Sequence, residues 1–412
     1  MRLRIVLPLL IVLGLFMAVQ AHATDLALVN AKIYLSPTET PIANGSILIH
    51  NGHILAVGPS ARIKVPRGAS VIDCKGLVVT AGFWNSHVHI LTTGLIHAET
   101  HSSDQITAEL QEMLTRWGFT TVFDIGSTLQ NTNLIRRRIE SGEVKGPRIL
   151  TVGEPLFMKG GVPSYIKGFL ETNHITMPEV ESTAQATGQV QQQIHDGADG
   201  IKIFANSIET NAILNMPLDL AQAGVTEAHR AGKPVFAHVS DNQGIEVAIQ
   251  SGVDILAHTT PADTPWSASL VHRLVAAHMA LTPTLTLWEI EFKGASPEEL
   301  EKGMNVAAQQ LGAFSQAGGQ ILFGTDIGYI LHFDTSEEFK WMSRAGMNYQ
   351  QILASLTTNP AQRFGYSTHS GRIVKGFDAD LVVLGSDPAQ GTSAYSNVRY
   401  TIRAGEILYA AK

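Results

Sequence analysis

The chain has 412 residues, of which 44% are hydrophobic and 16% are charged, and its formal net charge is -7. This balance predicts a large globular protein, with enough residues for one large α/β domain and a smaller one. The sequence has no basic run and no stripe of interleaved basic and aromatic residues, which argues against nucleic acid as a main partner.

The N-terminal segment has the pattern of an export signal. Two arginines precede a short apolar stretch, and Ala21-His22-Ala23 supplies a small-x-small cleavage site. The apolar stretch is shorter than the roughly 20 residues that a membrane-spanning helix needs. We therefore expect a signal peptide over residues 1–23 and a secreted or periplasmic mature protein with no membrane attachment after cleavage. An uncleaved anchor is the alternative.

Short β-rich segments occur near both ends of the mature chain. Alternating apolar residues separated by turn signals such as Asn51-Gly52 predict strands. These strands are expected at 26–34, 45–50, 53–57, 69–73, 379–384, 398–403 and 407–409. They predict a small β-sandwich domain formed by both chain ends, from residues 24–78 plus 365–412.

The middle of the chain alternates between strand-like and helix-like segments. Apolar segments predict strands at 81–89, 120–124, 148–152, 200–204, 234–238, 254–258, 279–283 and 320–324. Helical patterns between them cover 107–117, 183–196, 218–231 and 304–317. Alternating strands and helices are typical of a parallel sheet, and eight such units predict an α/β fold of the (β/α)₈ TIM-barrel type. We expect the barrel to span residues 79–364.

Side chains that bind or bridge metals stand at the ends of these strands. His87 and His89 are two positions apart, so in a strand both side chains point to the same face. Four more such residues end later strands: Lys202, His238, His258 and Asp326. Active sites of TIM barrels lie where the C-terminal ends of the strands meet, and imidazoles are favoured ligands of Zn²⁺. The pattern therefore predicts a metal centre at that face.

These motifs resemble those of the amidohydrolase superfamily, specifically its imidazolonepropionase-like members. The resemblance covers essentially the whole mature chain, and it rests on Gly-Phe-Trp-Asn-Ser-His-Val-His at 82–89, Gly-Ala-Asp-Gly-Ile-Lys at 197–202, the segment 238–258, Gly-Thr-Asp at 324–326 and Gly-Phe-Asp-Ala-Asp-Leu-Val-Val at 376–383. It implies two divalent metal ions, which we expect to be Zn²⁺, bridged by a carboxylated Lys202. By resemblance, one ion would be held by His87, His89, Lys202 and Asp326, and the other by Lys202, His238 and His258.

The resemblance also implies a mechanism. A lysine carbamate is an anion and suits a site between two cations, whereas an ammonium would be disfavoured there. A water or hydroxide between the ions would be the nucleophile, and Asp326 would accept its proton and pass it to the leaving nitrogen. We therefore expect a secreted amidohydrolase that cleaves an amide or peptide-type C–N bond in a small molecule or short peptide. The sequence leaves open whether the chain forms a homo-oligomer.

Aromatic and polar residues that follow the strands are candidates for contacting the substrate. They are Tyr165, Trp288, Tyr329 and His332. Loops after the strands of a barrel form the binding pocket, although packing within a loop is the alternative for each residue. The apolar character of these loops predicts a moderately hydrophobic substrate, such as an N-acyl amino acid or a short apolar peptide. His97 and His101 are expected at the surface or in supporting positions.

Three segments depart from the pattern of dipeptidase-like relatives. Those relatives commonly carry Gly-Gly-His-Gly after strand 3 and a tyrosine soon after the strand-5 histidine, whereas this chain has Gly-Gly-Val-Pro at 160–163 and Val-Ser at 239–240. Strand 6 ends in His-Thr-Thr-Pro at 258–261 rather than in the usual His-Gly. The metal-binding residues are all present, but these differences argue against a dipeptide-carboxylate-binding mode.

Other functions remain open on the sequence alone. One is an esterase or lactonase that uses the same two-metal site. Another is a mononuclear cyclic amidohydrolase or deaminase, in which His238 binds the single ion and His258 contacts the substrate. A third is a non-catalytic binding protein on the same scaffold, because function depends on the site rather than on the fold.

Overall fold

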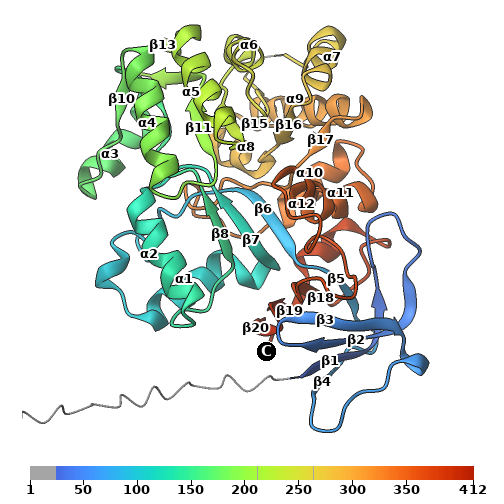
Figure 1. The fold of residues 1–412 in the computed structure, drawn as a ribbon. Helices are drawn as coiled ribbons and strands as arrows, with labels where there is room; N and C mark the ends of the chain where they lie inside the picture. Colours follow the sequence, from blue (N-terminus) through green and yellow to red (C-terminus); the bar gives the residue numbers. More distant parts are fainter. Residues whose placement is uncertain (1–24, 211, 263) are drawn as a thin grey trace, which may run out of the picture.

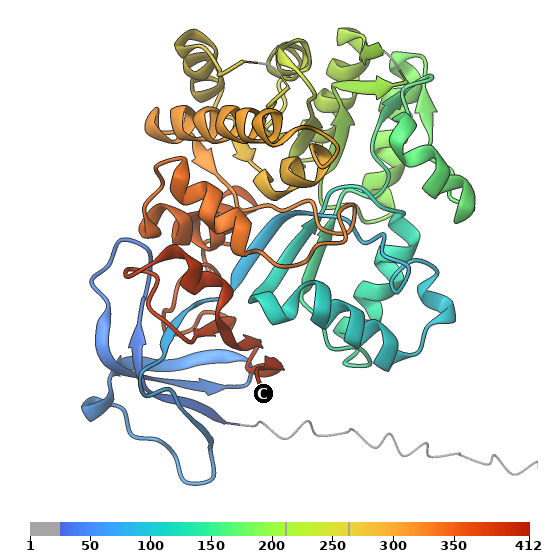
Figure 2. The same ribbon diagram turned by 180° about the vertical axis from the view of Figure 1, so that it is seen from behind.

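The computed structural model describes residues 25–210, 212–262 and 264–412, so the expected signal peptide lies outside the described residues. Figure 1 shows a larger α/β body above a smaller sheet in which the N-terminal strands lie beside the C-terminal ones. The view from behind shows helices along the outside of the larger body, with strands between them (Figure 2). Both chain ends therefore contribute to the smaller sheet.

Two groups of parallel strands form the centre of the larger body. The first group is β6 (Phe83–Val88), β7 (Phe119–Asp124) and β8 (Arg148–Thr151), and the second is β11 (Ile201–Phe204), β14 (Val235–His238), β15 (Ile255–Ala257), β16 (Ala280–Thr282) and β17 (Gln320–Ile321). Each overlaps a strand expected from the sequence. The groups are joined by backbone hydrogen bonds from Leu156 to Lys202 and from Ser86 to Phe323, both 2.7 Å long. The result is a TIM-barrel-like α/β fold.

Helices connect these strands. They are α1 (Ser103–Met113), α2 (Leu129–Glu140), α3 (Ser164–Thr172), α4 (Thr183–His195), α5 (Leu218–Arg230), α6 (Asn242–Ser251), α7 (Ala268–Ala276), α8 (Leu285–Glu291), α9 (Pro297–Gln316), α10 (Ser336–Arg344), α11 (Tyr349–Leu356) and α12 (Thr358–Arg363). Six of them, α1, α4, α6, α7, α9 and α11, begin after a Ser, Asp or Asn whose side chain accepts a hydrogen bond from the helix's third N–H. Helix α9 begins at Pro297 rather than at 304, because Ser296 and Glu299 form a capping box there.

The smaller sheet joins the two ends of the chain. Its strands are β1 (Leu26–Ile33), β2 (Ile42–His50), β3 (His53–Pro59), β4 (Ser70–Asp73), β5 (Val78–Ala81), β18 (Leu381–Leu384), β19 (Val398–Arg403) and β20 (Glu406–Ala410). Antiparallel pairing of β5 with β18 connects the N-terminal strands to the C-terminal ones. All eight strands pair as one continuous sheet, so the contribution of both ends is seen, whereas the sandwich arrangement and the domain limits stay predictions.

Strand β5 was not expected as a separate strand, because its apolar residues continue directly into β6. The break falls at Gly82, where the chain leaves the smaller sheet and enters the larger body. A Cβ atom at this position would lie 2.2 Å from Oγ1 of Thr120, so only glycine fits. Gly82 therefore lets the backbone pass close to Thr120 at the break between β5 and β6.

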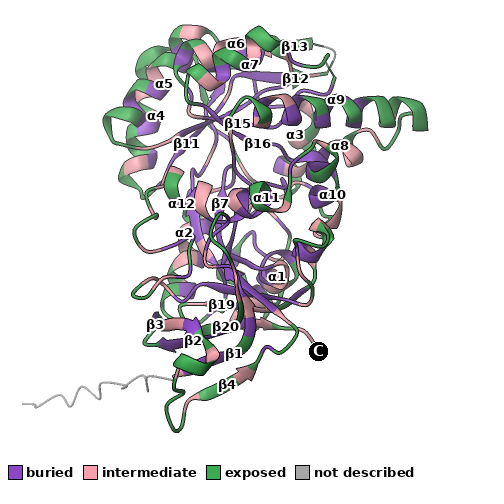
Figure 3. Ribbon diagram, turned by 90° about the vertical axis from the view of Figure 1, so that its right-hand side faces the viewer, coloured by how far each residue is buried: buried purple, intermediate pink, exposed green. Residues whose placement is uncertain are grey.

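Burial is concentrated in the strands. Figure 3 shows buried residues at the centre of the molecule and exposed residues on the outer helices. All residues of β6 and β14 are buried, polar ones included. Among the described residues, no helix is both long enough and apolar enough to cross a membrane. The strands thus carry side chains into an interior from which water is largely excluded.

Short elements that the sequence did not predict follow two of these strands. They are β9 (Phe157–Met158) and β10 (Glu179–Val180), which pair with each other, and the hairpin β12 (Asn206–Glu209) and β13 (Ala212–Asn215). Lys167 on α3 forms an ion pair with Glu209 of this hairpin, with 2.8 Å between Nζ and Oε1. These segments therefore lie beyond the C-terminal ends of β8 and β11.

Candidate metal centre

The six metal-type residues expected from the sequence come together at the C-terminal ends of the strands. His87 lies on β6 and His89 just beyond it, Lys202 lies on β11, His238 ends β14, His258 follows β15, and Asp326 follows β17. All are buried except His89, whose side chain is 14% exposed. The fold therefore assembles residues that lie up to 239 positions apart in the sequence.

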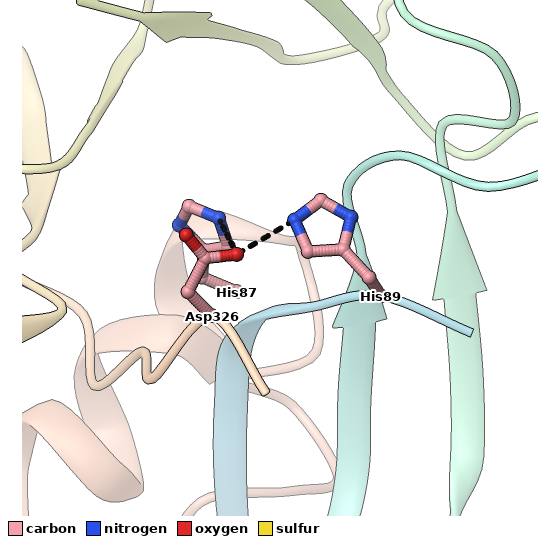
Figure 4. Close-up of side chains that lie close together, drawn as sticks. All are labelled: His87, His89 and Asp326. Atoms are coloured by element: carbon pink, nitrogen blue, oxygen red, sulfur yellow. Dashed lines mark ion pairs between the residues drawn. The ribbon is translucent and has the colours of Figure 1, made fainter. Parts of the chain in front are cut away.

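Three of these residues form a compact cluster. Oδ1 of Asp326 lies 2.8 Å from Nε2 of His89 and 3.3 Å from Nε2 of His87 (Figure 4). One ligand atom from each residue lies within 4.8 Å of the others, which is close enough for all three to bind one metal ion. Side chains of this type and spacing are those that bind Zn²⁺ and similar ions.

The hydrogen bonds of the two histidines decide which ring nitrogen faces the cluster. Nδ1 of His89 lies 2.6 Å from the carbonyl oxygen of Gly126, so it donates its proton there. Nδ1 of His87 lies 3.2 Å from the hydroxyl of Thr282, which itself donates to the carbonyl of Leu256. Each Nδ1 therefore carries a ring proton, and each Nε2 is the nitrogen that faces Asp326 and is placed to bind a metal ion.

Two buried polar atoms of this cluster bear on whether a cation fits there. Nε2 of His87 and Oδ1 of Asp326 are buried and have no hydrogen-bond partner among the described residues. Two ring nitrogens and a carboxylate oxygen thus converge on one point. Buried polar atoms left this way are costly, and a divalent cation would satisfy all three. The residues present fit a metal ion.

The other three residues extend this cluster. The imidazole rings of His87 and His258 are 4.6 Å apart, and those of His258 and His238 are 5.0 Å apart. Nδ1 of His258 lies 3.8 Å from Oδ2 of Asp326 and 2.8 Å from the hydroxyl of Thr284. Nε2 of His238 lies 3.1 Å from the hydroxyl of Ser240. His238 and His258 thus form a second group of candidate ligands beside the first.

Lys202 lies in the same interior and is 2% exposed. No carboxylate of the described residues is within 4.0 Å of its Nζ atom. Burial lowers the pKa of Lys202 to about 7, against an opposing effect of Asp326. A substantial fraction of this side chain is therefore a neutral amine at neutral pH, which is the form that reacts with CO₂.

Burial also sets the protonation of the other candidate ligands. It lowers the pKa of His87 and of His238 to about 3, and that of His258 well below its ordinary value. These imidazoles are therefore neutral, as metal ligands must be. Burial alone would raise the pKa of Asp326, but its histidine neighbours hold that pKa well below the usual range.

Unusual backbone geometry accompanies the site. His258 and Asp326 both have positive φ angles, 85° and 65°, which non-glycine residues rarely adopt. Two residues after Asp326, a Cβ atom at Gly328 would lie 1.8 Å from the carbonyl oxygen of His89. Strained conformations of this kind persist where the surrounding structure enforces them, and they cluster at functional sites.

Aromatic residues lie around the cluster. The rings of Tyr165 and Tyr329 are 5.6 Å apart in an edge-on arrangement, and the hydroxyl of Tyr329 donates to Glu291 at 2.9 Å. The Trp288 ring lies 5.9 Å from that of His258, and its Nε1 donates to the hydroxyl of Thr259. The pKa of both tyrosines is raised because their hydroxyl groups are poorly solvated, which keeps them as neutral phenols, although the Tyr165 residue as a whole is 44% exposed.

The remaining candidates lie differently. His332 is exposed and shows no contact with the metal-type residues among the described part of the chain. His97 is exposed, with Nε2 3.2 Å from the carbonyl of Asn173, and Nε2 of His101 lies 3.1 Å from the carbonyl of Ile96. The partners of the histidines, Thr282, Thr284 and Gly126, could not be recognised from the sequence, because these ordinary residue types give no local signal.

Comparison with known proteins agrees with this geometry. The profile of the amidohydrolase family matches residues 78–408. The chain belongs to the amidohydrolase family. It is therefore a hydrolase that acts on C–N bonds, in a family that depends on metal ions, and the cluster of His87, His89 and Asp326 is a possible metal-binding site.

Relatives of this amidohydrolase cover most of its length. Ochratoxinase from Aspergillus niger is 23% identical over 409 residues, which cover 89% of this chain and 83% of the relative. Imidazolonepropionase from Thermoplasma acidophilum is 24% identical over 402 residues, which cover 89% of this chain and 90% of the relative. The solved structure of a Xaa-Pro dipeptidase with bound methionine is 23% identical and superposes with a TM-score of 0.79, covering 94% of this chain and all of the other. That structural likeness supports the fold.

Proposed function

We propose that this amidohydrolase is a metal-dependent enzyme that cleaves the amide or peptide bond of N-acyl amino acids or short peptides. The observation that carries the proposal is the convergence of His87, His89 and Asp326, with Nε2 of both rings facing one carboxylate oxygen. A divalent cation would satisfy that arrangement. Family membership supplies the type of bond.

We propose two divalent metal ions, Zn²⁺ by the chemistry of the ligands, bridged by a carboxylated Lys202. His87, His89 and Asp326 would hold the first ion together with the lysine, and His238 and His258 would hold the second with it. The neutral imidazoles and the lowered pKa of Lys202 support this assignment, because burial favours the uncharged amine from which a carbamate forms.

When bound, the ions would lower the pKa of a water molecule and polarise the carbonyl of the substrate. The residues around them then have distinct tasks. Asp326 is ionised and buried beside the rings of His87 and His89, so its carboxylate is placed to accept a proton from the attacking water and to return it to the leaving nitrogen. The buried surroundings keep bulk water away and strengthen these charge interactions.

The proposed substrate carries an apolar or aromatic group. Tyr165, Tyr329 and Trp288 supply three rings near the candidate ligands, and aromatic side chains bury large apolar areas in binding pockets. The likeness to a Xaa-Pro dipeptidase supports a dipeptide or a related amide. Export of the enzyme is proposed from the signal-like segment alone, and sequencing the N-terminus of the mature protein should find Thr24.

Purified protein tests the proposal directly. N-acyl amino acids and dipeptides with aromatic, aliphatic and charged side chains should be assayed beside matched esters, before and after dialysis against a chelator. Amide hydrolysis that disappears with the metal and returns with Zn²⁺ is the expected result. Metal-independent turnover would contradict the metal centre, whereas turnover of the esters alone would favour an esterase on the same site.

A further inference from the structure

Helix α8 begins in an atypical way. Thr284 occupies its N-cap position, where a threonine hydroxyl normally accepts a hydrogen bond from the second or third N–H of the helix. Here the hydroxyl caps nothing, and the residue has a left-handed backbone with a φ angle of 47°. Its Oγ1 lies instead 2.8 Å from Nδ1 of His258. The hydroxyl of Thr284 thus contacts the candidate metal ligand His258 instead of capping the helix.

A buried carboxylate takes over the capping role. Glu338, on α10, is fully buried, and its Oε1 accepts a hydrogen bond from the N–H of Leu285 at 2.9 Å. Its Oε2 accepts from the N–H of Thr286 at 2.8 Å and from the hydroxyl of the same residue at 3.0 Å. These are the first N–H groups of α8, which have no partner inside the helix, and a carboxylate is favoured at that end of the helix dipole.

Nothing else in the described part of the chain accounts for this carboxylate. Glu338 forms no ion pair there, although a buried carboxylate costs stability unless its oxygens are well satisfied. Its hydrogen bonds within the described part of the chain all go to the first turn of α8. A threonine could cap this short helix at lower cost, but Thr284 cannot accept from its own helix and from His258 in the same position.

Helix α8 contacts His258 at a second place. The ring of Trp288 lies 5.9 Å from the imidazole, and its Nε1 donates at 2.9 Å to the hydroxyl of Thr259, the residue after His258. His258 itself has a φ angle of 85°, so its orientation is not one that an isolated chain would favour. The position of α8 therefore decides where this imidazole points.

We propose that Glu338 is a positioning residue of the metal centre. Glu338 accepts hydrogen bonds from the first N–H groups of α8, so the hydroxyl of Thr284 is not needed as a cap. That hydroxyl can then accept a hydrogen bond from Nδ1 of His258, which leaves Nε2 of the ring for a metal ion. Glu338 touches neither the ligands nor the substrate and acts through the helix. The inference rests on the proposed function only in taking His258 as a metal ligand.

Four variants and one benchmark test this arrangement. Thr284→Val removes the hydroxyl at nearly constant shape, and Thr284→Ser restores it. Glu338→Gln leaves one acceptor oxygen for the two N–H groups. Glu337→Gln is the matched control, because Glu337 is the preceding residue on α10 and forms an ion pair with Lys340. His258→Ala is the benchmark for losing the ligand itself.

Two measurements are needed. In metal-free protein, nitrogen NMR of the His258 ring reports which nitrogen carries the proton. Competition with a chelator then gives the affinity for the first and the second equivalent of Zn²⁺. We expect T284V and E338Q to lose the fixed Nδ1–H form and to bind the second equivalent about 10- to 100-fold more weakly. T284S and E337Q should behave like the wild type.

The outcomes separate the two levels of the proposal. A wild-type ring tautomer and second-site affinity in T284V would overturn the role of the hydroxyl, and the same result in E338Q would overturn the role of Glu338. If E338Q does not fold, E338D takes its place, because its shorter side chain cannot reach both N–H groups. Two ions bound by H258A as by the wild type would refute His258 as a ligand, and the NMR result would still decide the positioning.

Discussion

The two halves of the metal centre are built differently. In the half formed by His87, His89 and Asp326, the ligand atoms already converge within 4.8 Å, and each imidazole is oriented by a hydrogen bond from Nδ1. The half formed by Lys202, His238 and His258 has no anion of its own, because the nearest carboxylate oxygen to His258 belongs to Asp326, 3.8 Å away. The first half is preorganised by the fold, whereas in our proposal the second half is completed by the carboxylation of Lys202.

The largest effect should come from breaking the preorganised half. Asp326→Asn keeps the shape of the side chain but removes the charge that both imidazoles face and the proposed proton acceptor. We expect kcat/KM to fall by about a thousandfold or more, since general acid–base catalysis alone is worth 10²–10⁴-fold. Metal content should fall as well. Asp334→Asn, at an exposed position in the same segment, is the control. Near-normal turnover by D326N would refute its assigned role.

The other half should respond to CO₂. Apoprotein supplied with Zn²⁺ in CO₂-free buffer should bind one equivalent tightly and a second weakly, and bicarbonate should raise both the second-site affinity and the activity. Lys202→Ala should show neither increase, while Lys159→Ala, at an exposed lysine, should show both. Metal titration with and without bicarbonate checks this. Two tightly bound ions beside an unmodified Lys202, seen by mass spectrometry of the intact protein, would contradict the bridge.

The raised pKa of Glu338 predicts that the free energy of unfolding depends on pH. Burial raises the pKa of this carboxyl group from its ordinary 4.5 to about 7, against the opposing hydrogen bonds from Thr286 and Leu285, and the nearby Glu289 adds to the rise. The folded state therefore binds this proton more tightly than the unfolded state, so the associated stability is complete below pH 4.5 and is lost as the pH rises through 7.

Relative to Glu338→Gln, the wild type should lose up to about 3 kcal/mol of unfolding free energy between pH 4.5 and pH 8. Urea denaturation of both proteins at several pH values measures this difference. The variant Glu337→Gln should follow the wild type throughout. A difference between wild type and E338Q that stays constant over this range would show that the carboxyl group does not titrate there.

The smallest expected effects concern the aromatic residues beside the second half. Trp288→Ala should raise KM for substrates with an aromatic group by about tenfold and change turnover of small aliphatic amides much less, as loss of apolar contacts usually does. His332→Ala should change neither, because the side chain of His332 is exposed. Steady-state kinetics on paired substrates decides this. Equal losses for both classes would mean that Trp288 acts on the metal centre rather than on specificity.

The strands of the larger body and the identities of the candidate ligands could be predicted from the sequence. All eight strands of the larger body were predicted from apolar runs, and each metal-type residue could be recognised because His, Lys and Asp at strand ends are chemically distinctive. The pairing of both chain ends was also expected. These features depend on local periodicity and residue type, both of which are visible within a few positions.

The orientation of those ligands depends on contacts between residues that are far apart in the sequence. Thr282 lies 195 positions from His87, with which it forms a hydrogen bond. Glu338 lies 53 positions from Leu285, whose N–H group donates a hydrogen bond to it. The glycine that separates β5 from β6 and the capping of α8 were equally hidden. Such contacts join ordinary residue types across long loops, and their geometry follows from the packing of whole elements, so no pattern along the chain encodes them.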